Sequence, residues 1–308
     1  MSEQGPYAVL DVGSNTIRLL VARLHEGKLQ PVDDQSEFVR LGRGVDKTGE
    51  LDPDRQRAAL QTIATLAGQA RSLGADGVVA IATSAVRDAA NGERFAQLVK
   101  ESTGVELEII SGEREAYLTY MGATLGIPIE SGAMVCDLGG GSAELIHADK
   151  SGMRWATSVP LGSGRLTERF LRHDPPTAEE QDRLAAYVRS VLEDLPAARV
   201  EVAILTGGTA THLAWLAGRD GMIEHVDSRT VEQVMAILSS EPASEIVSRY
   251  DVKPERAQVL PAGVRALQTL AQYYAVDHIV ITRHGIREGT LIDYLQHASK
   301  WPERRNSS

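Results

Sequence analysis

The chain has 308 residues, of which 43% are apolar and 24% are charged, and its formal net charge is −10. This length and composition predict two globular domains, each with a hydrophobic core of ordinary size. A general nucleic-acid-binding protein needs an excess of Lys and Arg to release counterions, so the acidic balance argues against nucleic acid as a partner.

The sequence has no run of eighteen or more apolar residues, and we expect neither a membrane span nor a membrane partner. The N-terminal segment MSEQGPYAVLDVGS lacks the basic and apolar regions of a signal peptide. Cys136 is the single cysteine, which excludes an intramolecular disulfide and a cysteine-rich zinc site. We therefore expect a cytoplasmic protein.

The first half of the chain alternates strands with helices. Residues 7–24 read as an apolar strand, the turn GSNT and a second apolar strand, the pattern of a hairpin, with a third strand around 29–32. Asp52-Pro53 begins a helix that apolar positions at helical spacing extend to residue 73. A strand, a helix, a strand and a helix should follow, at 77–83, 92–102, 105–110 and from Ser111-Gly112 onward.

The opening pattern recurs at residues 133–148, where AMVCDLGGGSAELIH matches YAVLDVGSNTIRLL. Asp137 lies 126 positions after Asp11, and at this offset Gly139 falls on Gly13. A repeat of this length predicts two similar halves that face each other across a cleft.

The second half continues the alternation. A helix that starts near 162–165 and a second helix over 177–195 precede a strand at 202–206, and the turn GGTATH opens another helix. We expect a helical stretch from there to Tyr274, a strand at 278–282, a loop RHGIREG and a last helix that packs back on the first half. This order of elements predicts an α/β fold.

Two glycine-bearing loops follow equivalent strands, and each begins with an aspartate. Glycine lets backbone N–H groups approach an anion closely, and such loops bind phosphate oxygens. Because carboxylates repel phosphates, the aspartates imply a bridging divalent cation or an ordered water. A pair of ordinary hairpin turns is the alternative. The residues expected to bind phosphate are Gly13, Ser14, Asn15, Gly139, Gly140, Gly141 and Ser142.

A third glycine loop, Thr206 to Thr209, lies between a strand and a helix. The N-terminus of a helix attracts anions, so Gly208 and Thr209 are further candidates for binding phosphate. No G-x-G-x-x-G opens a helix with an acidic residue about 20 positions later, and the Walker A pattern is absent. A dinucleotide cofactor is therefore not expected.

Two glutamates, Glu113 and Glu115, stand in the first turn of the helix that Ser111-Gly112 begins. Phosphoryl transfer to water needs a carboxylate that orients the water in line with the leaving oxygen. First-turn acids also stabilise a helix through its dipole, and for these residues alone the dipole role is the simpler interpretation.

Seven motifs occur in order: DVGSNTIRLL, TSAVRDAAN, ISGEREA, DLGGGSAELI, VPLGSGRLTE, LTGGTAT and GIREG. Together they resemble the exopolyphosphatase/guanosine-pentaphosphate phosphatase (Ppx/GppA) family, of the actin and hexokinase superfamily, over residues 7–292. The resemblance implies two ribonuclease-H-like (actin-like ATPase) domains with a cleft between them. The first would span 1–122 with a C-terminal helix, 291–308, packed on it, and the second 123–290.

The resemblance also implies roles for individual residues. Glu115 would be the general base, and Arg87 would neutralise a phosphate near the scissile bond. Asp137 and Glu144 would bind Mg²⁺ or Mn²⁺, with Asp11 near by. On this comparison catalysis becomes the preferred role for Glu115.

The activity implied is the release of terminal orthophosphate from inorganic polyphosphate. Longer family members carry an additional C-terminal helical region, which this sequence lacks, so short chains are the expected substrates. The alternatives are a guanosine pentaphosphate 5′-phosphohydrolase, a phosphotransferase of the same superfamily, or a sensor that binds these ligands without consuming them. Relatives are commonly dimers, and we expect a homodimer.

Overall fold

The computed structural model describes residues 5–25 and 28–296. The chain divides into two compact units, which are residues 1–125 with 285–308 and residues 126–284. The boundaries expected from sequence were 122 and 290, and residues 297–308 of the expected C-terminal helix lie outside the described residues. Among the described residues, no helix combines the length and apolar character that crossing a bilayer requires.

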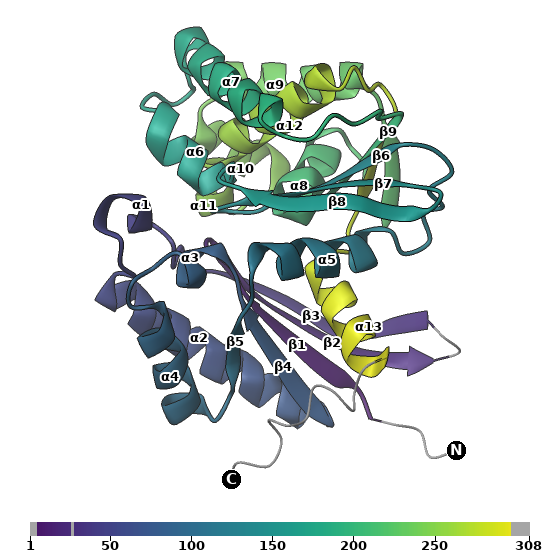
Figure 1. Ribbon diagram of the computed structural model, residues 1–308. Helices are drawn as coiled ribbons and strands as arrows, with labels where there is room; N and C mark the ends of the chain where they lie inside the picture. Colours follow the sequence, from purple (N-terminus) through teal and green to yellow (C-terminus); the bar gives the residue numbers. More distant parts are fainter. Residues whose placement is uncertain (1–4, 26–27, 297–308) are drawn as a thin grey trace. The chain divides into compact units, whose positions relative to one another are not determined.

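The first unit contains a five-stranded mixed sheet in the order β3-β2-β1-β4-β5. Strand β1 pairs antiparallel with β2 and parallel with β4 (Figure 1). The strands are β1 Tyr7–Val12, β2 Thr16–His25, β3 Lys28–Phe38, β4 Gly77–Ala82 and β5 Leu107–Ile109. The helices are α1 Val45–Thr48, α2 Pro53–Ser72, α3 Ser84–Arg87, α4 Gly92–Thr103, α5 Gly112–Ala123 and α13 Ile286–Gln296.

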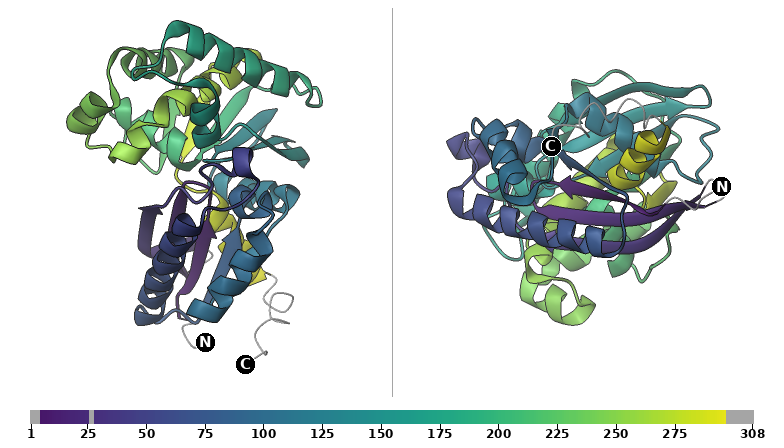
Figure 2. Two further views of the ribbon diagram at one scale, coloured as in Figure 1. Left: turned by 90° about the vertical axis from the view of Figure 1, so that its left-hand side faces the viewer. Right: turned by 90° about the horizontal axis from the view of Figure 1, so that it is seen from below.

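Helices cover both faces of this sheet, which explains why β1 is apolar at nearly every position. Leu10 belongs to a core with Ile63 of α2 and Phe95 of α4. Its neighbour Val9 packs with Leu291 of α13 instead. Figure 2 shows the same arrangement of helices around the sheet in two further views.

The second unit contains a six-stranded sheet in the order β10-β11-β9-β6-β7-β8. Without β10 and read from the other edge, this order is β8-β7-β6-β9-β11, in which the strands correspond one by one to β3-β2-β1-β4-β5 of the first unit. The strands are β6 Ala133–Leu138, β7 Ala143–Asp149, β8 Gly152–Val159, β9 Val202–Thr206, β10 Ile223–Val226 and β11 Ile279–Thr282. The helices are α6 Ser163–Phe170, α7 Ala178–Glu193, α8 Gly207–Leu216, α9 Ser228–Ser240, α10 Ala243–Tyr250, α11 Pro254–Ala257 and α12 Leu260–Tyr273.

The two opening hairpins have the same register. Asp11 pairs with Arg18 across β1 and β2, and Asp137 pairs with Glu144 across β6 and β7. Both members of the second pair lie 126 positions after those of the first. The repeat seen in the sequence is therefore confirmed as a repeat of backbone structure.

Several elements differ from the sequence-based expectation, and the strand β8 and the short helices α1 and α3 were not expected at all. Strand β3 is longer than 29–32, and β10 interrupts the stretch expected to be helical up to Tyr274. A four-residue edge strand such as β10 is too short to show an alternating pattern. The segment RHGIREG is helical from Ile286, because Glu288 accepts a hydrogen bond from the Gly285 N–H at 2.7 Å and satisfies a donor at the start of α13.

Candidate functional site

The two glycine loops after β1 and β6 are closed by equivalent hydrogen bonds. The Gly13 N–H donates to the Thr16 carbonyl at 3.1 Å, and the Gly139 N–H donates to the Ser142 carbonyl at 3.0 Å. Each loop therefore presents the same tight turn at the end of the strand that carries its aspartate.

The loop of the first unit contains a buried donor. The Ser14 hydroxyl is buried and hydrogen-bonded to the Ser84 hydroxyl at 2.9 Å. The Asn15 Nδ2 is buried and has no hydrogen-bond partner among the described residues. A buried amide without an acceptor costs free energy, so this group is suited to a ligand oxygen.

Asp11 lies at the end of β1 and is buried. Burial raises the pKa of its carboxyl above the usual value, and the positive charges of Arg18 and Arg287 oppose that rise in pKa. Arg287, from α13, is itself paired with Asp34 at 2.5 Å. The Asp11 carboxylate thus occupies a poorly hydrated position beside two cations.

Arg87 and Glu115 are in direct contact within the first unit. The Arg87 Nη1 lies 2.7 Å from the Glu115 Oε2 and also donates to the Ile110 carbonyl at 3.1 Å. Glu115 is only 5% exposed, whereas Glu113, two residues earlier in α5, is exposed. The interpretation as a solvated first-turn acid therefore fits Glu113 and does not account for the burial of Glu115.

In the second unit, Asp137 and Glu144 lie opposite each other on neighbouring strands, so their side chains share one face of the sheet. Glu144 is buried, and its Oε1 accepts hydrogen bonds from the hydroxyls of Ser142 at 2.9 Å and Ser158 at 2.8 Å. Gly207 has φ of 84°, and a Cβ there would lie 2.1 Å from the Asp137 Oδ1. Only glycine fits beside this carboxylate.

The start of α6 fixes the loop of Gly139 to Gly141. Ser163 N–H donates to the Gly139 carbonyl at 2.8 Å, and the Arg165 Nε donates to the Gly141 carbonyl at 2.7 Å. A Cβ on Gly162 would lie 2.3 Å from the Gly141 carbonyl carbon. The loop carbonyls are therefore engaged by α6, while within the described residues the N–H groups of Gly140 and Gly141 have no backbone acceptor.

The third glycine loop begins α8. A Cβ on Gly208 would lie 2.6 Å from an Arg256 guanidinium nitrogen, so this arginine lies directly against the loop. Thr209 is fully buried, and a Cβ on Gly263 of α12 would lie 2.8 Å from its hydroxyl. The Thr209 hydroxyl is buried beside α12 and, among the described residues, has no hydrogen-bond partner, so both this hydroxyl and the loop backbone are suited to an anion.

Sequence reasoning did not identify Ser84, Ser158, Gly162 or Arg256. Ser84, 70 residues from Ser14, and Arg256, near Gly208, become neighbours of the loops only through tertiary structure. Gly162 lies in the motif VPLGSGRLTE, and a glycine within a motif could have indicated a close backbone contact at this position.

Among the residues proposed to bind a divalent metal, two carboxylates lie close enough on one sheet face to bind the same ion. Within the described part of the chain, no group of three or more His, Cys, Asp or Glu side chains is arranged to bind a metal ion. Asp137 and Glu144 nevertheless supply two carboxylates on one sheet face. Mg²⁺ is commonly bound through one or two carboxylates together with water and substrate phosphates, so the donor chemistry of this pair suits it.

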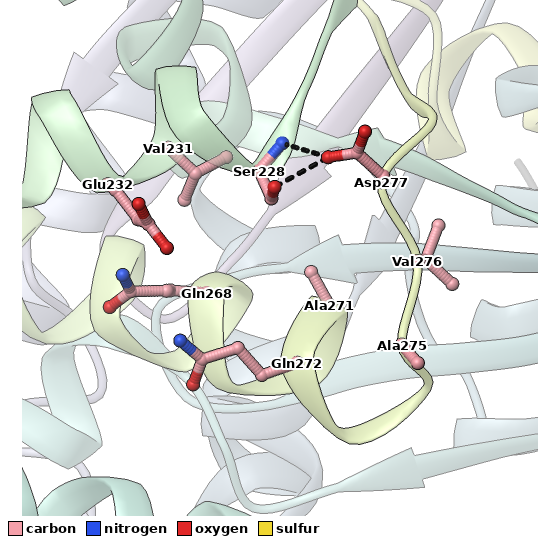
Figure 3. A pocket seen from close by; sticks show the side chains of 9 residues that line it. All are labelled: Ser228, Val231, Glu232, Gln268, Ala271, Gln272, Ala275, Val276 and Asp277. Carbon is pink, nitrogen blue, oxygen red and sulfur yellow. Dashed lines mark hydrogen bonds between the residues drawn. The ribbon is translucent and has the colours of Figure 1, made fainter.

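A pocket of about 500 Å³ lies elsewhere in the second unit, beside α9, α12 and the segment before β11 (Figure 3). Glu232, Gln268 and Gln272 line it, and Asp277 accepts a hydrogen bond from the Ser228 N–H at 3.0 Å. None of the candidate site residues lines this pocket.

Comparisons with known proteins agree with one another. Residues 20–298 match the Ppx/GppA phosphatase family. Exopolyphosphatase 2 of Mycobacterium tuberculosis is 33% identical over 313 residues, covering 92% of this chain and 96% of that protein. Exopolyphosphatase 1 of the same organism is 30% identical over 297 residues, covering 92% of this chain and 86% of that protein.

A crystal structure of the Aquifex aeolicus member of the Ppx/GppA protein family has a TM-score of 0.79 and 27% identity, covering 96% of this chain and 98% of that chain. The expected α/β class, with two ribonuclease-H-like units of the actin-like ATPase fold, is confirmed by this similarity and by the strand order of both sheets. From a family match over most of its length and relatives at 30% identity or more, we conclude that this chain belongs to the Ppx/GppA phosphatase family and is a hydrolase.

Proposed function

We propose that this protein releases terminal orthophosphate from inorganic polyphosphate by attack of a water molecule. The observation that carries the proposal is the alignment with Exopolyphosphatase 2 over 96% of that relative's length. The paired glycine loops support it, because repeated anion-binding turns suit a substrate with repeated phosphates.

In this proposal the loop after β1 in the first unit, and the loop after β6 and the backbone at the start of α8 in the second unit, are each phosphate-binding elements of their own unit. The Gly140 and Gly141 N–H groups and the Asn15 side-chain amide would donate to phosphate oxygens. Asp137 and Glu144 would bind the divalent metal, with Asp11 as a further acidic residue. Bound Mg²⁺ or Mn²⁺ would offset negative charge on the phosphates during the reaction.

Glu115 would act as the general base and Arg87 as a phosphate ligand. A general base near neutral pH must be ionised, and the contact with the Arg87 guanidinium favours the ionised carboxylate. A guanidinium has five N–H donors, so Arg87 is able to contact Glu115 and a phosphate oxygen at the same time. Glu115 would then accept a proton from the attacking water.

The test is phosphate release from tripolyphosphate and long polyphosphate, with and without Mg²⁺ or Mn²⁺. Glu115→Gln should lose roughly 10²–10⁴-fold in rate and keep substrate binding. Glu113→Gln, an exposed neighbour, is the matched control and should keep wild-type turnover. Wild-type turnover in Glu115→Gln would exclude this residue as the base, whereas release that requires an added acceptor would indicate a phosphotransferase.

The preference for short chains, the homodimer and the cytoplasmic location stay predictions. A chain-length series in the same assay addresses the first of them, and sedimentation analysis addresses the second.

A further inference from the structure

Two exposed histidines of the second unit, 53 residues apart in the chain, are in direct contact. His225 is the third residue of β10, and His278 immediately precedes β11. These strands pair antiparallel, with His225 opposite Val280. Side chains at alternate positions of a strand point to the same face, so His278 lies on the face that Val280 and His225 share. The two imidazoles are therefore diagonal neighbours at the edge of the sheet.

The distance between the two rings matches that of a pair of metal ligands. The His225 Nδ1 lies 3.2 Å from the His278 Nε2, and the ring planes are inclined by 16°. Two nitrogens that bind one tetrahedral Zn²⁺ at about 2.0–2.1 Å are about 3.3–3.4 Å from each other. Rotation of the exposed rings is thus enough to direct both lone pairs at one ion, and the backbone need not move.

The protonation chemistry of the pair is compatible with a metal ion. In an N–H···N contact one ring donates and the other accepts, so the accepting nitrogen carries no proton. When both rings are neutral, transfer of the shared proton to the far nitrogen of its own ring frees both facing lone pairs. The far nitrogens belong to exposed side chains and are able to donate to water, as the second N–H of a metal-bound imidazole commonly does.

The backbone holds both histidines in a fixed sheet. Strand β11 pairs with β10 on one side and with β9 on the other. The His278 carbonyl also accepts a hydrogen bond from the Ala203 N–H at 3.0 Å. The two imidazoles are therefore positioned before any ion binds, which reduces the entropy lost on binding.

The local charge favours a cation. Asp227 lies two residues after His225, and Asp277 immediately precedes His278. Hydrogen bonds from the Thr230 and Ser228 hydroxyls lower the pKa of Asp227 and Asp277, respectively, so both carboxyls are ionised near neutral pH. Two negative charges beside the pair attract a divalent ion.

The donor atoms select the kind of ion. Imidazole nitrogen suits Zn²⁺, Cu²⁺ and Ni²⁺, whereas Mg²⁺ prefers oxygen ligands. Within residues 5–25 and 28–296, no third His, Cys, Asp or Glu is arranged with the pair to bind a metal, so water would complete the coordination. The pair differs in this respect from Asp137 and Glu144, which offer carboxylate oxygens.

We propose that His225 and His278 form a surface site for a divalent transition-metal ion, with Zn²⁺ and Cu²⁺ the best suited. The ion would connect β10 to β11 and so stabilise the short edge strand β10, because an ion that binds only the folded state raises its stability. This proposal does not depend on the phosphohydrolase function.

The experiment measures Zn²⁺ binding by calorimetry and Cu²⁺ binding by electron paramagnetic resonance, both in excess Mg²⁺, which occupies oxygen sites. In the wild type, bound Cu²⁺ should show coupling to two imidazole nitrogens, and Zn²⁺ should raise Tm. His225→Gln and His278→Gln should each raise the Kd for Zn²⁺ roughly 10²-fold, because one ligand alone loses the advantage of two linked ligands. Their Tm without metal should match that of the wild type, since both side chains are exposed.

His25→Gln is the matched control, because it removes an exposed histidine of the first unit and should leave the Kd for Zn²⁺ unchanged. Coupling of Cu²⁺ to fewer than two imidazole nitrogens in the wild type would overturn the proposal without recourse to any variant. An unchanged Kd in either His225→Gln or His278→Gln would also overturn it, as would an equal loss of affinity in His25→Gln.

Discussion

Asp11, a candidate functional residue, affects the stability of the fold through the ionisation of its buried carboxyl. Its carboxyl is buried, and burial raises its pKa above 3.8 despite Arg18 and Arg287. The folded protein therefore binds the Asp11 proton more tightly than the unfolded chain does. It follows that ionisation of Asp11 destabilises the fold as pH rises through the window that begins near 3.8.

We expect Asp11→Asn to increase the free energy of unfolding at pH 7 by about 1 kcal/mol and to lower the phosphatase rate. The gain in stability should disappear as pH falls below the unfolded pKa, where both proteins carry a neutral side chain. Urea unfolding at pH 7 and pH 3.5 measures this difference. Glu50→Gln, at an exposed acid, should have little effect at either pH.

The contact between Arg87 and Glu115 also affects the stability of the protein. Replacing Glu115 leaves a guanidinium without its 2.7 Å carboxylate partner, so a change in stability should accompany the change in rate. For this reason the Glu115→Gln assay includes substrate binding, which a general unfolding would abolish and loss of a base would not.

Helix α7 shows how local capping supports an element. Thr177 and Glu180 form a capping box, and Glu180 also accepts hydrogen bonds from the Arg172 N–H at 2.8 Å and the His173 Nδ1 at 2.9 Å. Burial by itself raises the pKa of Glu180, but the hydrogen bonds from His173, Thr177 and Arg172 outweigh it and lower the pKa to about 2. The ionised carboxylate therefore stabilises the fold.

Glu180→Gln should destabilise the protein by about 2 kcal/mol at pH 7. A lowered acid pKa gives stability that is complete above the unfolded value of 4.5 and is lost as pH falls toward about 2. The difference between variant and wild type should therefore narrow over that window in chemical unfolding. Glu179→Gln is the control, since its side chain is 81% exposed, and a similar loss there would contradict the assignment.

After the second unit, the chain re-enters the first unit as helix α13, which packs against α5. This packing requires glycine at two positions. Helix α13 packs on α5 so closely that a Cβ on Gly289 would lie 1.8 Å from the Leu118 carbonyl oxygen. A Cβ on Gly122 would lie 1.8 Å from the Gly285 carbonyl oxygen. Because backbone atoms form these contacts, neither position has a side chain that is able to move aside.

Gly289→Ala should lower the free energy of unfolding by about 3 kcal/mol or more, because α13 must move away from α5. Gly68→Ala in α2 is the matched control. A Cβ there would meet nothing within 4 Å, so the change should raise stability by roughly 0.5–1 kcal/mol. Thermal unfolding checks both, and wild-type stability in Gly289→Ala would contradict the close packing of α13.

The features that could be predicted from the sequence are those that depend on short-range patterns. The apolar strands, the glycine turns at Gly13 and Gly139 and the 126-residue repeat predicted two related α/β units, because strand periodicity and turn chemistry act between neighbouring residues. The motifs also indicated the family and singled out Glu115 over Glu113, a choice that neighbouring residues alone did not make.

The contacts between distant side chains follow from the packing of whole elements. This packing paired Arg87 with Glu115 across 28 residues, set Ser158 against Glu144, and placed Arg256 beside Gly208. It also brought His225 and His278 together across 53 residues. Such contacts depend on how whole helices and strands pack, and a chain distance of tens of residues leaves no local pattern from which to predict them.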